Sequence, residues 1–143
     1  MKYTNILLKY EPYFFYLIII ANLLPILLFE TFPTVDGPAH LYNSRLIVEL
    51  LTDENSRLND FFEFNKSLNP NWSGHFILSS LMLLFPAFIA DKILLSLYLV
   101  FFPISFRFLF KTLQLKETYL LYFIFPFTYS FMFYYGFYNF HIG

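Results

Sequence analysis

The sequence predicts an all-α integral membrane protein with about four transmembrane helices and an amphipathic surface helix in the first outer loop. Of its 143 residues 58% are hydrophobic and only 13% are charged, whereas about a quarter of the residues of a soluble domain are charged. The apolar residues also gather in long runs, and about 20 consecutive ones suffice to cross a hydrocarbon core of about 30 Å. A soluble globular enzyme is therefore excluded.

Charge balance and cysteine content exclude further classes of protein. The 9 Lys and Arg residues nearly balance the 10 Asp and Glu residues, and they form no basic cluster, so we expect no nucleic-acid partner. The chain has no cysteine, which excludes a disulfide framework, a thiolate metal site and a cysteine nucleophile. We expect membrane lipid and neighbouring membrane helices as its partners.

The first apolar run, residues 13–32, is long enough to cross the bilayer once. Lys2 and Lys9 precede it and favour a cytoplasmic N-terminus in the cell (inner) membrane, because Lys and Arg gather on the cytoplasmic side. No small-residue cleavage motif follows Phe32, so we interpret this run as an uncleaved anchor. It tolerates Pro25, because neighbouring helices can satisfy the freed carbonyl.

Residues 33–73 form the outer polar loop. Nearly half of the charged residues lie here, namely Asp36, Arg45, Glu49, Asp53, Glu54, Arg57, Asp60, Glu63 and Lys66. A helix is predicted over about 38–51, since Pro38 suits a first helical turn and Asp36 can cap it. Its mixture of leucines with polar residues is typical of a helix that lies along a membrane surface.

Three further spans are predicted over residues 74–90, 92–110 and 118–140, separated by Asp91-Lys92 and by residues 111–117. Four full crossings would place Arg107, Lys111 and Lys116 on the outer side, against the usual bias of cations toward the cytoplasm. Two alternatives stay open. Either the region 74–110 does not cross twice, or these cations lie outside. There they could act on an anionic lipid headgroup, but an ordinary solvated loop at the membrane surface is the favoured interpretation.

The string Asp36-Gly-Pro-Ala-His40 places a carboxylate and an imidazole at the exit of the first span, with Arg45 further along the helix. A carboxylate can deprotonate a hydroxyl or hold a divalent cation, an imidazole can shuttle a proton, and a guanidinium can grip a phosphate. The alternative is structural: Asp36 caps the helix, His40 is interfacial, and Arg45 extends its charge to water over an apolar stem.

The last apolar run carries polar side chains of its own. On a continuous helix Tyr134, Tyr138 and His141 fall on one stripe, close to Asn139. A polar stripe within a span is a candidate functional surface, and an interfacial aromatic belt is the alternative. Trp72 suits the headgroup level, and His75 at the start of the next span could join the site but is expected to be structural.

This layout resembles the N-terminal part of the GT-C-type glycosyltransferases. The residues that carry the resemblance are Asp36-Gly-Pro-Ala-His40 after the first span and Gly136-Phe-Tyr-Asn139-Phe near the end. The protein mannosyltransferase branch has Asp-Glu followed shortly by His, whereas here Gly37 replaces the second acid and His40 lies one position later. The chain looks closer to bacterial membrane proteins of the same superfamily that pair an Asp-x-Pro-x-His-like loop with a Gly-Phe-x-Asn-Phe-like segment.

The resemblance implies a glycosyltransferase, inverting in its stereochemistry, that uses a polyprenyl-phosphate-linked sugar donor. It implies that Asp36 is the catalytic base or a metal-associated acid, and that His40 supports it. Whether a divalent metal takes part is left open, and Asp36 is the residue that would hold one. Arg45, Asn139 and His141 are the expected substrate-binding residues. Since such enzymes have many more spans, we expect the chain to be an N-terminal portion. The alternative is a non-catalytic multi-span membrane protein: a transporter portion, an assembly subunit or a scaffold.

Overall fold

The computed structural model describes residues 2–65, 67, 72–115 and 118–139. All regular elements within these residues are helices, which confirms the all-α prediction for this part of the chain. In chain order they are α1 (Lys2–Leu28), α2 (Gly37–Thr52), η1 (Arg57–Asp60), α3 (Ser73–Met82), α4 (Ala87–Thr112), η2 (Thr118–Ile124), α5 (Phe125–Thr128) and α6 (Phe131–Tyr135).

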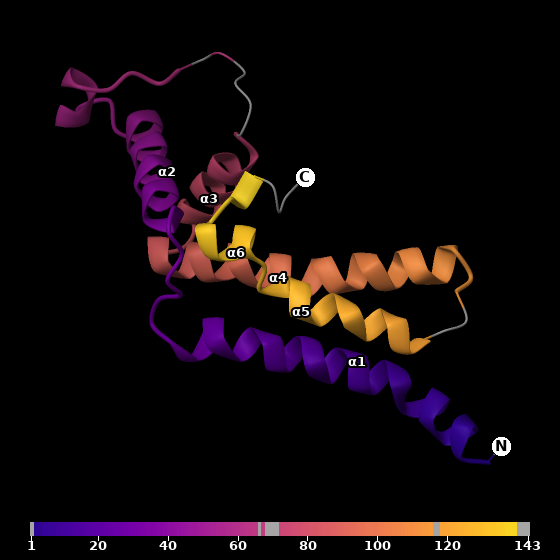
Figure 1. Cartoon of the computed structure of the whole chain (residues 1–143). Coiled ribbons are helices and arrows are strands. Elements are labelled where there is room, and N and C mark those ends of the chain that lie inside the picture. The colour runs from indigo at the N-terminus through magenta and orange to yellow at the C-terminus, as the bar shows by residue number, and fades with distance from the viewer. Residues whose placement is uncertain (1, 66, 68–71, 116–117, 140–143) are drawn as a thin grey trace.

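Two long apolar helices, α1 and α4, lie side by side (Figure 1). They run antiparallel (Figure 1), because Glu11 in the first half of α1 contacts Arg107 near the end of α4, whereas Ile26 near the end of α1 lies in one cluster with Ala90 near the start of α4. Lys9–Leu28 and Ala87–Thr112 are long and apolar enough to cross a membrane. The 10 residues of α3 rise only about 15 Å, half of the hydrocarbon thickness. Within the described residues two helices, not four, therefore have the length and composition of a span.

The break between the expected spans 74–90 and 92–110 lies elsewhere than the sequence indicates. Helix α3 ends at Met82, and α4 begins at Ala87 and continues through Asp91 and Lys92. Pro86 is the residue before α4 and cannot extend α3, because it has no backbone N–H. Asp91 does not interrupt α4, because its carboxylate is buried and accepts a hydrogen bond from the Tyr138 hydroxyl.

The expected span 118–140 is not one helix. Its described part is divided into η2, α5 and α6, and Gly136 ends α6 in the left-handed conformation at φ 77°. A glycine is suited to this position because a side chain is strained there. The chain reverses at Gly136, so Tyr134 and Tyr138 do not share a helical stripe: Tyr134 is exposed and Tyr138 is buried.

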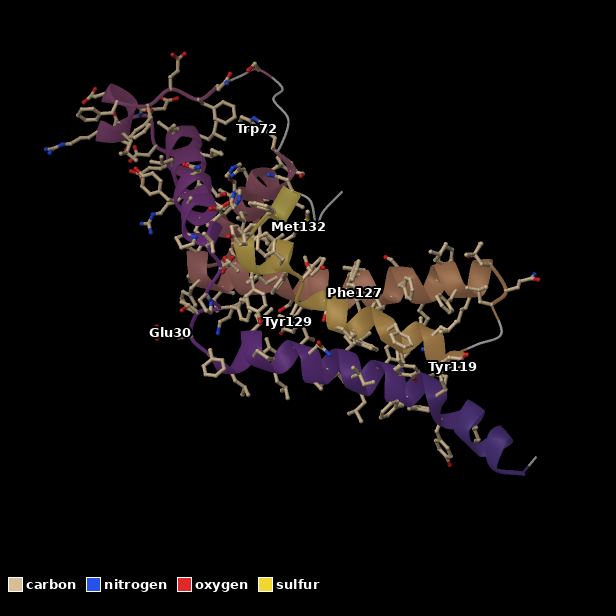
Figure 2. All side chains as sticks on the ribbon, in the orientation of Figure 1. Glu30, Trp72, Tyr119, Phe127, Tyr129 and Met132 are labelled. Carbon is tan, nitrogen blue, oxygen red and sulfur yellow. The ribbon has the colours of Figure 1, made fainter. Side chains whose placement is uncertain are left out.

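The segment η2 to α6 passes along α4 and α1 (Figure 1) and satisfies the one amide side chain of the first span. Asn22 accepts a hydrogen bond from Thr128 through its Oδ1 atom (3.1 Å) and one from the Tyr129 hydroxyl through its backbone carbonyl (2.5 Å). Figure 2 places Tyr129 beside α1. Asn22 is thus compatible with an apolar helix, because its polar groups are bonded within the protein.

Helix α2 runs across the direction of α1 and α4, with α3 beside it (Figure 1). Its bounds match the helix that the sequence predicts over about 38–51. One buried apolar cluster joins α1, α3, α4 and α6 around Ile26, Leu78, Leu99 and Phe133. This cluster connects the α2 and α3 pair to the two long helices, and the candidate site lies at that junction.

Candidate functional site

The turn before α2 and the turn after α6 are held together by backbone hydrogen bonds. The amides of Val35 and Asp36 donate to the carbonyls of Tyr134 (3.0 Å) and Tyr135 (2.9 Å). A Cβ on Gly136 would lie 2.9 Å from the Gly37 nitrogen, so only glycine allows this approach. The motifs that begin at Asp36 and at Gly136, about 100 residues apart in sequence, thus meet in space.

Asp36 is the residue before α2, but its carboxylate makes no capping hydrogen bond to that helix. An N-cap side chain usually bonds the amide of the second or third helical residue. Here the second residue is Pro38, which has no amide proton. The half-buried Asp36 carboxylate accepts no hydrogen bond within the part of the chain that the structure describes, so it is free to bind a ligand or accept a proton.

His40, one turn after Asp36, lies between two other rings. Its imidazole stacks on Tyr138 with centroids 4.9 Å apart at 25°, and it contacts the His75 ring at 4.9 Å. Burial lowers the pKa of His40, while the Asp36 carboxylate and the Gly136 backbone act in the opposite direction. Its Nδ1 atom is buried without a partner among the described residues. A neutral imidazole of this kind can accept a proton.

His75 joins this cluster from the first turn of α3, although the sequence favours a structural role for it. Its Nδ1 atom lies 3.3 Å from the Ser44 hydroxyl of α2. Burial, followed by the proximity of His40, lowers the pKa of His75. The pair therefore favours two neutral rings, because a charge on one ring would oppose a charge on the other.

Tyr138 connects the cluster to an apolar cavity. Its hydroxyl donates to Asp91 Oδ1 (2.8 Å) and lies 3.4 Å from the Thr34 hydroxyl. The cavity, of about 250 Å³, lies between α3, α4 and α6 and is lined by Ile77, Leu94, Leu95, Leu97, Tyr98, Phe101, Phe133 and Tyr138. The sequence shows Asp91 only as a break between two apolar runs and Tyr138 only as a member of a polar stripe, so their hydrogen bond could not be predicted from it.

The other expected binding residues lie apart from Asp36 and His40. Arg45 is exposed and follows Asp36 by nine residues, or 2.5 helical turns, so it points to the opposite side of α2. There it lines a different pocket with Glu49. Asn139 accepts hydrogen bonds from the Gly74 amide (2.7 Å) and the Ser73 hydroxyl (3.0 Å), which stabilises the start of α3. His141 lies outside the described residues.

The described side chains do not form a metal site. No group of three or more His, Asp or Glu residues lies together within the described ranges in a way that could hold an ion. A hard divalent cation prefers about six oxygen ligands, and Asp36 could supply at most two of them. We therefore assign no step to a metal.

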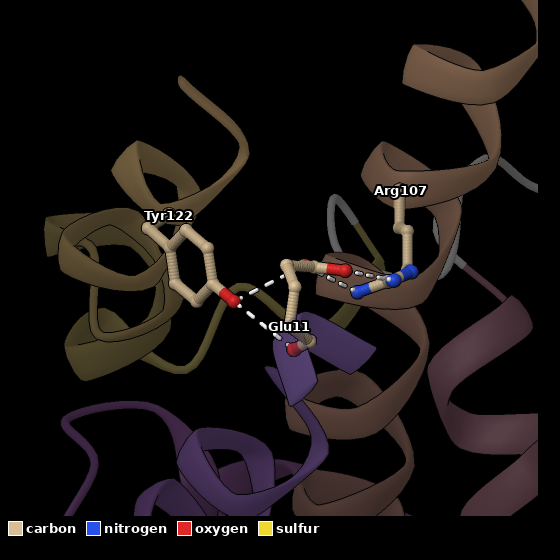
Figure 3. A network of polar contacts seen from close by, with 3 residues as sticks. All are labelled: Glu11, Arg107 and Tyr122. Atoms are coloured by element: carbon tan, nitrogen blue, oxygen red, sulfur yellow. Dashed lines mark hydrogen bonds and ion pairs between the residues drawn. The ribbon is translucent and has the colours of Figure 1, made fainter. Parts of the chain in front are cut away.

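A second polar cluster lies between the two long helices (Figure 3). The Arg107 guanidinium donates two hydrogen bonds to the Glu11 carboxylate (3.0 and 2.6 Å), and the Tyr122 hydroxyl donates another (3.1 Å). The Arg107 guanidinium also lies 4.5 Å from the Phe15 ring centre. Arg107 is therefore a buried residue of α4 that is paired within the protein, and it is not a cation of a solvated outer loop.

Comparisons of this chain with protein-family models, with curated proteins and with solved structures found no match.

Proposed function

We propose that the chain belongs to a GT-C-like membrane glycosyltransferase that moves a sugar from a lipid-linked donor to an acceptor at the outer membrane face. The observation that carries the proposal is the position of Tyr138. One side of this residue stacks on His40 beside Asp36, and the residue also lines the apolar cavity. A carboxylate and an imidazole are thus connected, through Tyr138, to a space that suits a hydrocarbon chain.

Asp36 acts as the general base in this proposal. Its carboxylate takes the proton of the acceptor hydroxyl while the oxygen attacks the anomeric carbon of the sugar, and the lipid phosphate leaves with the bonding electron pair. Inversion follows from a single displacement on the face opposite the leaving group. His40 supports the carboxylate as a neutral neighbour that can receive the proton, since its Nδ1 is unoccupied among the described residues.

The cavity supports a lipid-linked donor over a nucleotide-sugar donor. Its walls are aliphatic and aromatic side chains of α3, α4 and α6, which favour the burial of hydrocarbon over that of a charged base and ribose. The cavity also adjoins α4, a helix of the length and composition of a span. A donor that diffuses within the bilayer would reach it without leaving the lipid.

The proposal includes a membrane orientation, with the N-terminus in the cytoplasm and α2 and α3 outside. Two antiparallel crossings by α1 and α4 place Arg107 and Lys111 at the same end as Lys9, which agrees with the bias of cations toward the cytoplasm. The alternative in which the region 74–110 does not cross twice is thereby favoured. A cysteine at the exposed position Glu54 should react with an impermeant thiol reagent in intact cells, and one at Lys111 only after permeabilisation.

The test of the catalytic proposal is the Asp36→Asn substitution, assayed in membranes that contain the full-length protein. Transfer from a polyprenyl-phosphate-linked sugar should fall, because an amide cannot take up a proton at neutral pH. Asp53→Asn is the matched control, since Asp53 is an exposed acid at the other end of α2. Unchanged transfer by the Asp36→Asn protein would reject the proposed role.

A non-catalytic membrane subunit is the second candidate, and the exposed face of α1 favours it. Large apolar side chains on that helix, such as Tyr13, Leu17 and Leu28, are exposed, and no described part of the chain covers them. Such a face suits partner helices as well as lipid. This candidate predicts that neither Asp36 nor His40 affects any transfer reaction.

A further inference from the structure

A second apolar pocket lies between α2 and α3, on the other side of α3 from the cavity beside Tyr138. It has a volume of about 290 Å³. Its walls include Ile47 and Leu51 of α2 and Phe76 and Leu83 of α3. Ile77 of α3 lines the first cavity and lies about 100° further around the helix than Phe76. The two linings have no residue in common, so the two spaces are separate.

The three hydroxyl side chains that line this second pocket are already bonded within the protein. The hydroxyl of Ser79 donates to the Ser44 carbonyl (3.2 Å), that of Ser80 to the Phe76 carbonyl (2.8 Å) and that of Thr52 to the Val48 carbonyl (2.7 Å). His75 Nδ1 lies 3.3 Å from the Ser44 hydroxyl. The pocket lining includes no charged residue. A sugar, nucleotide or ion would find few free partners here, so the pocket suits hydrocarbon.

The lining of the pocket has features of a membrane boundary. Phe64 and Trp72 line the pocket as an edge-to-face pair with ring centroids 5.3 Å apart, and the indole of Trp72, with its polar N–H, favours the headgroup level. Phe76 is 71% exposed and Leu83 61% exposed. Leu83 lies four residues before α4 enters its apolar stretch. The pocket thus has one end close to the surrounding lipid.

From these features we infer that the pocket between α2 and α3 binds one acyl chain of a bilayer phospholipid. An apolar cavity of about 150 Å³ can stay dry and bind an apolar ligand. An inserted chain would contact both α2 and α3, including His75 at the start of α3. This site is distinct from the donor cavity and does not depend on the proposed transferase activity.

Trp72 provides the readout, because it is the only tryptophan of the chain and it lines the pocket. The chain is reconstituted in phosphatidylcholine vesicles whose acyl chains carry bromine, a contact quencher of tryptophan emission. We expect a loss of Trp72 emission relative to vesicles of unbrominated lipid. Retained emission in the brominated vesicles would overturn the inference, whether water or another protein segment covers the pocket.

Ser80→Phe separates a chain inside the pocket from lipid outside it. The new ring fills the pocket from the α3 side and should restore Trp72 emission in brominated lipid. Ser105→Phe adds the same ring to an exposed position of α4 and should leave the quenching unchanged. Quenching that persists in the Ser80→Phe protein would overturn the inference, because bromine would then reach Trp72 from outside.

A second variant and a competing lipid test the same inference. Leu51→Phe fills the pocket from α2 and replaces Ser80→Phe if that variant does not fold, with the same expected recovery. Unbrominated polyprenyl phosphate added to the brominated vesicles should leave the quenching unchanged. Recovery of Trp72 emission on its addition would instead assign the pocket to a prenyl chain and overturn the assignment to an acyl chain.

Discussion

Arg107 and Glu11 form a two-pronged ion pair that fixes how α4 packs on α1. Both side chains are largely buried, at 10% and 14% exposure, and the Tyr122 hydroxyl adds a third donor to the carboxylate. Charges within a membrane are costly unless they are paired inside the protein. The pair therefore sets the antiparallel register of the two long helices and, through α4, the position of the candidate site.

Loss of one partner of this pair should destabilise the chain strongly. Glu11→Gln leaves the Arg107 charge uncompensated, and we expect the free energy of unfolding to fall by about 3 kcal/mol. Detergent-induced unfolding followed by circular dichroism measures the change. The double variant Glu11→Leu with Arg107→Leu removes both charges and should recover much of the loss. Equal stability of the Glu11→Gln and wild-type proteins would show that the pair does not hold the helices.

Gly136→Ala should separate the turn after α6 from the turn before α2. The left-handed conformation costs a residue with a side chain about 1–2 kcal/mol, and the added Cβ would also lie too close to the Gly37 nitrogen. We expect faster proteolysis of the segment after α6. Gly136→Asn distinguishes the two causes, because asparagine tolerates the left-handed conformation but also carries a Cβ. A stable Asn variant would assign the effect to backbone strain and not to the close contact.

Tyr138→Phe should destabilise the junction by leaving Asp91 buried without its hydrogen bond. The expected cost is about 1–3 kcal/mol, since the Asp91 carboxylate is 8% exposed and the Tyr138 hydroxyl is its donor. The thermal midpoint of the reconstituted chain measures it. Adding Asp91→Leu to the Tyr138→Phe protein removes the unpaired carboxylate and should restore part of the stability. A further fall in the double variant would contradict this account.

The contact between His40 and His75 should make stability depend on pH. Burial lowers the pKa of both rings below the ordinary value of 6.5, so the folded state binds fewer protons than the unfolded state. Stability is therefore complete above pH 6.5 and falls as the pH falls below that value toward the lowered pKa values. Thermal midpoints measured on both sides of pH 6.5 test this sign. His75→Gln should flatten the dependence, and a midpoint that rises on acidification would contradict it.

Local signals along the sequence predict part of this structure well. Pro38 and Asp36 mark the start of α2, which the structure places at Gly37. The composition also predicts an all-helical chain, since long apolar runs without strand alternation favour helices. These features depend on neighbouring residues, so they can be read without knowledge of tertiary contacts.

The errors arise where a distant partner decides the structure. The sequence predicts that a span ends just before Asp91. In the structure the Tyr138 hydroxyl, 47 residues away, donates a hydrogen bond to the Asp91 carboxylate, and α4 continues through it. The sequence likewise predicts an outer position for Arg107, because its partner Glu11 lies far away in the first helix and cannot be recognised from neighbouring residues. The resemblance brought the Asp36 and Gly136 motifs into one comparison, but nothing local indicated that the two turns share backbone hydrogen bonds.

The central claim is that Asp36 is the base of a sugar-transfer reaction. The most direct measurement is the initial rate of transfer from a polyprenyl-phosphate-linked sugar, compared between Asp36→Asn and Asp53→Asn proteins at equal abundance in membranes. Loss of a general base typically slows a reaction by about 10²- to 10⁴-fold, so the Asp36→Asn protein should fall into that range while the Asp53→Asn protein keeps the wild-type rate. Equal rates for the two variants would contradict the claim.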